Sequence, residues 1–209
     1  MTFRSLALTT GALAGLLLAT SALAPDASAQ TAPPMRIRGT ITALDGNVLS
    51  VTSREGLPLK INLPDEVGVS VPKKLDLSAI GPNSYIGTAA LPQPDGTLRA
   101  QEVVVFPETA RGTGEGQYPW DLSAGSSMTN ANVAAVVSGT NGRELSLTYK
   151  GGTAKLVIPP DAPIVTFVPA TRADLKPGMK VFLAATKAAD GALSAARVTV
   201  EKDGVAPPI

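Results

Sequence analysis

The sequence predicts an all-β protein in which one small barrel occurs twice in tandem, and three observations support this prediction. Apolar and polar residues alternate over short segments, as around Leu49 and Val51, which is typical of strands with one buried face. Pairs such as Asp45-Gly46 separate these segments, and they favour the tight turns of β-hairpins. The third observation is an internal repeat, which divides the chain into two similar halves.

The repeat is clearest between residues 81–105 and residues 176–200, which align without a gap. Nine of these 25 aligned pairs are identical, and they include the Asp-Gly pair of each segment. The similarity continues upstream in two shorter pairs of segments, 60–64 with 155–159 and, beyond a single-residue gap, 46–52 with 142–148. A shared order of turns and strands over this length predicts a duplicated module.

Within each copy the elements follow in the same order. An Asp-Gly or Asn-Gly pair, at Asp45-Gly46 and Asn141-Gly142, joins the first two strands as a hairpin. A short helical turn and a second hairpin follow, at residues 76–80 and Asp95-Gly96 in the first copy and at residues 172–176 and Asp190-Gly191 in the second. Three or four strands, a helical turn and two further strands are the parts of a small, OB-like barrel. An open sandwich would use the same strands, so closure of the barrel stays open at this point.

Several motifs resemble those of a known family. They are Gly39-Thr40-Ile41, Leu49-Ser50-Val51, the turn at residues 173–178, the segment 190–195 and the final Val198-x-Val200. Together they resemble a family of bacterial exported proteins of unknown function that are built from small OB-like modules. The resemblance covers most of the chain after residue 29 and implies a fold rather than an activity. Such relatives are sometimes labelled metal-transporter permeases, but a permease needs several membrane-spanning helices.

The first 29 residues have the features of a signal peptide. Arg4 supplies a positive charge, residues 6–24 are almost wholly apolar or small, and Ala27-Ser28-Ala29 offers the small residues that a signal peptidase accepts. We therefore expect cleavage between Ala29 and Gln30, and a periplasmic or secreted protein without a further membrane span. An uncleaved membrane anchor is the alternative, because the apolar segment approaches the roughly 20 residues that span a bilayer.

The expected organisation is a signal peptide (1–29), a first β-barrel module (30–106), a Gly-rich connector (107–131), a second β-barrel module (132–201) and a tail (202–209). The connector interleaves glycines with large side chains, among them Trp120, the only tryptophan of the chain. In one interpretation, Trp120 and Leu122 pack into a seam between the modules. In a second, the connector is a ligand-contact loop, because binding residues concentrate on loops held by rigid scaffolds. In a third, the connector is disordered. The candidate binding residues are Arg111, Glu115, Tyr118, Trp120 and Asp121.

Composition excludes several kinds of chemistry. The chain has no histidine and no cysteine, so a Ser-His-Asp triad, a Cys-His pair and a histidine-ligated metal are impossible. A net charge of +1 lacks the basic excess that nucleic-acid binding requires. No cofactor, metal or catalytic residue is therefore predicted. The predicted function is a non-catalytic binding or adaptor protein for an unknown envelope protein or oligomeric ligand. The alternative is an enzyme or accessory factor that acts on cell-envelope glycans through carboxylates.

Overall fold

The computed structural model of the chain describes residues 33–139 and 142–208. The predicted signal peptide, its cleavage position before Gln30 and residue Asn141 of one predicted turn lie outside the described residues. The described chain is all-β, and its helical segments are short 3-10 turns. Its elements are β1 (Met35–Asp45), β2 (Val48–Ser53), β3 (Pro58–Asn62), β4 (Gly68–Lys74), η1 (Leu77–Ala79), β5 (Tyr85–Pro92), β6 (Leu98–Val105), η2 (Glu108–Ala110), β7 (Gly116–Pro119), β8 (Ser127–Gly139), β9 (Gly142–Tyr149), β10 (Gly152–Ile158), β11 (Ile164–Ala170), η3 (Arg172–Asp174), β12 (Lys180–Lys187), β13 (Leu193–Ser194) and β14 (Arg197–Val200).

The turns at Asp95-Gly96 and Asp190-Gly191 lie between strands, as the sequence predicts. In each turn the aspartate carboxylate accepts a hydrogen bond from the backbone N–H two residues later, that of Thr97 or Ala192, at 2.9 Å. The glycines have φ values of 83° and 87°, which a residue without a Cβ adopts at little cost. The same local chemistry therefore forms the same turn twice.

Five strands form a closed barrel, which we call barrel 1. Antiparallel pairs join β1 to β2 and β2 to β3, and a parallel pair joins β3 to β13. Strand β12 closes the ring because it pairs with both β13 and β1. The interior is apolar, and it includes Ile41, Leu49, Ile61 and Leu183, each at most 1% exposed. The alternating pattern of the sequence thus places one face of each strand in this core.

A second closed ring, barrel 2, repeats this order of pairing. Strands β8, β9 and β10 form consecutive antiparallel pairs, and β10 pairs in parallel with β6. Strand β5 closes the ring through antiparallel pairs with β6 and β8. Its core includes Ile86, Leu145, Leu147 and Leu156, which are fully buried.

Each barrel contains strands from both expected modules, which differs from the division that the repeat suggests. Barrel 1 combines β1, β2 and β3 with β12 and β13, whereas barrel 2 combines β8, β9 and β10 with β5 and β6. The boundaries expected at 30–106 and 132–201 therefore do not coincide with the barrels. Each of these ranges contributes strands to both closed rings.

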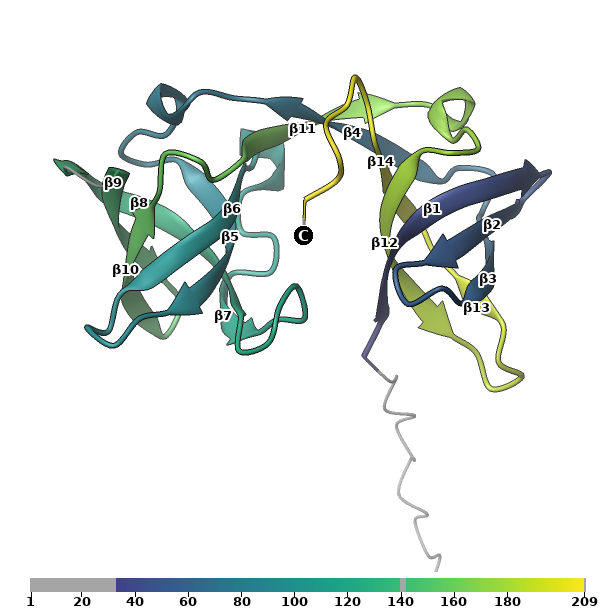
Figure 1. Cartoon of the computed structure of the whole chain (residues 1–209), viewed down its shortest axis with the longest axis horizontal. Helices are drawn as coiled ribbons and strands as arrows, with labels where there is room; N and C mark the ends of the chain where they lie inside the picture. Colours follow the sequence, from purple (N-terminus) through teal and green to yellow (C-terminus); the bar gives the residue numbers. More distant parts are fainter. Residues whose placement is uncertain (1–32, 140–141, 209) are drawn as a thin grey trace, which may run out of the picture. The chain divides into compact units, whose positions relative to one another are not determined.

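Strands β4 and β11 explain why each barrel contains strands from both expected modules, an arrangement that we call the exchange of strands. They pair antiparallel with each other, from Val69 opposite Ala170 to Lys74 opposite Val165. Strand β4 also pairs in parallel with β14, and β11 with β6, so the two strands link the barrels (Figure 1). Because β4 continues as an extended strand, it carries the chain out of barrel 1 before β5 begins.

Part of the expected connector is regular structure. Residues Gly116–Pro119 form β7, which pairs antiparallel with β8. Strand β8 itself begins at Ser127, so the expected end of the connector at Ala131 lies inside this strand. The irregular segment is therefore shorter than the sequence suggests, and it is attached to barrel 2 through β7.

Candidate functional site

Trp120 joins a loop of barrel 2 to the first strand of barrel 1. It follows β7, and its ring centroid lies 3.8 Å from the guanidinium carbon of Arg36 on β1. The guanidinium carbon of Arg38, on the same strand, lies 5.9 Å from the ring centroid, within the range of a cation–π contact. Tyr118 packs edge-on against the indole, with 6.0 Å between the ring centroids. The indole is therefore partly buried between two arginines and a tyrosine.

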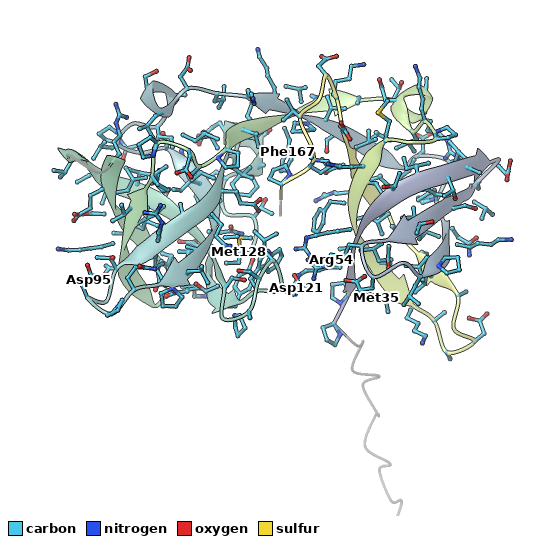
Figure 2. The ribbon with its side chains drawn as sticks, viewed as in Figure 1. Met35, Arg54, Asp95, Asp121, Met128 and Phe167 are labelled. Carbon is cyan, nitrogen blue, oxygen red and sulfur yellow. The ribbon has the colours of Figure 1, made fainter. Side chains whose placement is uncertain are left out.

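Asp121 continues this contact with barrel 1. The Nη2 atom of Arg38 donates to its carboxylate Oδ1 at 3.0 Å, and Nη2 of Arg54 donates to its backbone carbonyl at 2.9 Å. Figure 2 shows Arg54 and Asp121 facing each other. Partial burial raises the pKa of Asp121, but the hydrogen bond from Arg38 and the charges of Arg38 and Arg36 outweigh it, so the pKa lies below its ordinary value. Asp121 is thus ionised at neutral pH and anchors the loop to barrel 1.

The other two charged candidate residues make their contacts on barrel 2. Arg111 donates to both carboxylate oxygens of Glu108, at 2.6 and 2.7 Å, and to the backbone carbonyl of Asn83 at 2.8 Å. Glu115 accepts a hydrogen bond from the backbone N–H of Lys150 at 3.1 Å. The contacts of Arg111 and Glu115 hold the first half of the connector in place. They are separate from the contacts of Trp120 and Asp121.

Buried polar side chains fix the middle of the connector. The hydroxyl of Tyr85 donates to the carbonyl of Thr113 at 3.0 Å, and the amide of Asn130 donates to the same carbonyl at 3.1 Å and to the Tyr118 hydroxyl at 3.3 Å. Burial raises the pKa of Tyr85 to about 12, and the nearby Glu115 and Tyr118 add to the effect. Burial also raises the pKa of Tyr118. Both phenols are therefore neutral hydrogen-bonding groups at physiological pH.

A pocket of about 340 Å³, which we call the basic pocket, lies beside the residues that hold Asp121. Its lining residues are Arg38, Gly39, Thr40, Thr52, Ser53, Arg54, Lys180, Val181, Ala206 and Pro207. Three of these side chains are cationic, three carry hydroxyl groups, and no acidic residue is among these described residues. Such a lining suits a ligand that offers oxygen acceptors.

Sequence reasoning selected Trp120 and Asp121 but missed the basic residues around them. One signal was available, because Arg36 and Arg38 flank Ile37, which is 3% exposed. Alternation along a strand therefore places both guanidinium groups on the outer face of the barrel. No comparable signal connects Arg54 with Lys180, which come from opposite halves of the chain.

Two other pockets offer different chemistry. A pocket of about 730 Å³ lies near the pairing of β3 with β13, and Arg197 is the one charged residue among its described lining residues. A smaller one, of about 160 Å³, contains the carboxylates of Asp174, Glu201 and Asp203. The backbone N–H of Thr171 and the ammonium of Lys202 lower the pKa of Asp174 to about 2. That carboxylate already forms the capping box of η3.

The chain matches no family model, no curated protein and no solved structure. Within residues 33–139 and 142–208, no group of three or more acidic residues is placed to hold a metal ion. In the same part of the chain, no helix has the length and apolar character needed to cross a membrane.

Proposed function

We propose that this chain is an exported, non-catalytic binding or adaptor protein, and that its ligand binds at the basic pocket. The observation that carries the proposal is the position of this pocket. It shares Arg38 and Arg54 with the contacts that fix Asp121, so the hydrogen bonds of these two side chains hold one of its walls in place. Binding groups placed on a rigid support lose little conformational entropy when a ligand arrives.

The arrangement of strands supports an OB-like assignment for both barrels. In barrel 1 the closed order is β1, β2, β3, β13, β12, with β3 and β13 parallel, and barrel 2 has the corresponding order β8, β9, β10, β6, β5. Val103 pairs in parallel with Ile164, and Val198 pairs in parallel with Val69. In the aligned repeat, residue 103 corresponds to residue 198 and residue 69 to residue 164, so the same contact occurs twice, which supports duplication of one module. OB-like barrels often bind oligomers on one face, so an oligomeric envelope ligand fits by analogy of fold.

The proposal is tested with protein purified from the periplasm. Its intact mass is expected to correspond to a chain that begins at Gln30.

A panel of glycan oligomers, peptidoglycan fragments and short peptides should contain a member that raises the melting temperature, because a ligand of the folded state stabilises it. Ala206→Phe narrows the basic pocket without changing its charge and should reduce this shift, whereas Ala173→Phe, on the exposed turn η3, should not. A retained N-terminus in the membrane fraction would contradict export, and equal shifts in the two variants would contradict this binding site.

A further inference from the structure

We propose that the group bound in the basic pocket is an oxyanion, a phosphate or a carboxylate carried by an envelope polymer. This inference rests on the binding function proposed above and adds the chemical class of the ligand. Three separate features of the pocket and its surroundings lead to it: an excess of positive charge, hydrogen-bond donors without acceptors, and a lining of hydroxyl groups.

The charges around the pocket do not balance. Arg36, Arg38, Arg54 and Lys180 supply four positive charges in and beside the pocket. The carboxylates that face these side chains are Asp121, which pairs with Arg36 and Arg38, and Glu55, whose Oε1 lies 2.7 Å from Nε of Arg54. Glu201 is also near and accepts from the backbone N–H of Lys180 at 3.1 Å.

Among the described residues, the ammonium group of Lys180 makes no ion pair. A flexible cation on the wall of a pocket, with no carboxylate to hold it, is free to contact a negatively charged ligand. Lys180 is also exposed, so its removal should leave the barrel intact.

Two buried donors in the same cluster have no acceptor among the described residues. They are Nε of Arg38 and Nε1 of Trp120. Nearly all buried polar groups in proteins are hydrogen-bonded, so each of these donors calls for an oxygen atom nearby. Of the two side chains, Arg38 lines the pocket, and its guanidinium is an obligate donor, which favours an anion over a cationic or donor-rich ligand.

The remaining lining fits a phosphate or carboxylate on a sugar unit. Thr40 and Thr52 are exposed hydroxyl residues of the pocket wall, and Pro207 adds apolar surface. A volume of about 340 Å³ is at the lower end of the range for small-molecule sites. One charged unit of a polymer would fit within it, and the rest of the polymer would lie outside.

Isothermal titration calorimetry of the mature protein tests this inference with three probes of matched length. They are a glycerol-phosphate oligomer, an oligogalacturonate and a neutral dextran oligomer. We expect one of the two anionic oligomers to bind more tightly than dextran, with an affinity that falls as salt concentration rises. Lys180→Gln should weaken this binding by about three- to tenfold, as the loss of one partly exposed charge contact does. The matched control is Lys187→Gln, which removes the same charge from an exposed position of β12 outside the pocket, and it should leave the affinity unchanged.

The outcomes separate the two proposals. Binding of the phosphate oligomer or of the uronate oligomer identifies which source of the oxyanion the pocket takes. Tighter binding of dextran, or equal losses in the Lys180→Gln and Lys187→Gln variants, overturns the oxyanion assignment and leaves the binding function in place. If none of the three oligomers binds, the oxyanion assignment fails, and the wider panel described above then decides the binding function.

Discussion

Neither half of the chain is expected to fold as a monomer when residues 30–107 and residues 108–209 are expressed separately. The first fragment carries three strands of barrel 1 and two strands of barrel 2, so neither ring can close within it in the observed arrangement. As long as β4 stays extended, β3 leaves Ile61 uncovered, because the neighbour of Ile61 in barrel 1 is Leu193 of the other fragment. Burying one such side chain contributes about 1.5–3 kcal/mol, and each fragment loses many of them at once.

The measurement is circular dichroism with analytical ultracentrifugation of each fragment and of their mixture. Alone, each fragment should lack a cooperative thermal transition as a monomer, and an equimolar mixture should recover the spectrum of the intact chain in a one-to-one complex. A fragment that pairs with a second copy of itself is also consistent with the exchange, because each half contains every type of strand. A folded monomeric fragment with a cooperative transition is the result that would contradict it.

Trp120→Ala is expected to lower the free energy of unfolding by about 2–3 kcal/mol. Truncating a large buried aromatic costs about 3–5 kcal/mol, and Trp120 is only partly buried. Part of this loss is the cation–π contact of Arg36, whose guanidinium carbon lies 3.8 Å from the ring centroid. Contacts of this kind contribute about 0.5–2 kcal/mol. The backbone bond from Trp120 to Ser126 remains, so the loss belongs to the side chain.

Urea unfolding of the wild type and the variant checks this value. Leu57→Ala is the matched control, because Leu57 is 58% exposed and its truncation should change stability by less than about 0.5 kcal/mol. As the only tryptophan, Trp120 should also emit at shorter wavelength than a water-exposed indole. Emission at the water-exposed limit, together with a stability equal to that of Leu57→Ala, would show that Trp120 does not fasten the loop to barrel 1.

The turns and strands were predictable because their causes are local. Asp95-Gly96 and Asp190-Gly191 form turns through an aspartate that bonds to the backbone two residues away, and this chemistry needs no distant partner. The alternation of Leu49 and Val51 likewise predicts a strand with one buried face, which the core of barrel 1 confirms.

The exchange of strands was not predictable because the repeat makes both arrangements nearly equivalent. Leu98 and Leu193 occupy the same place in the two copies, so Ile61 could bury the same type of side chain in either pairing. Hydrophobic patterns report which face is buried but not which copy of a strand covers it. The choice depends on whether the link before β5 turns back or extends, and in this protein it extends as β4.

The candidate site shows a similar limit. The sequence selected Trp120 and Asp121 because a large aromatic in a Gly-rich loop needs a surface to cover. It could not identify Arg38 as the partner of Asp121, which lies 83 residues away. Arg111 and Glu115 were selected for the same loop, yet their bonds to Glu108 and Lys150 serve its attachment to barrel 2.

Cysteine cross-linking tests the exchange of strands most directly. Because the sequence contains no cysteine, the cross-linker reacts only with the two cysteines that are introduced. Asn62 on β3 lies opposite Ser194 on β13, whereas in a barrel closed within one copy it would lie opposite Arg99, the counterpart of Ser194 in the repeat. We compare the double variants Asn62→Cys with Ser194→Cys and Asn62→Cys with Arg99→Cys, each treated with a short bifunctional maleimide and digested for peptide mass analysis. The exchange predicts a cross-linked peptide in the pair that includes residue 194 and none in the pair that includes residue 99. The reverse result would contradict the exchange and would restore two barrels that each close within one copy.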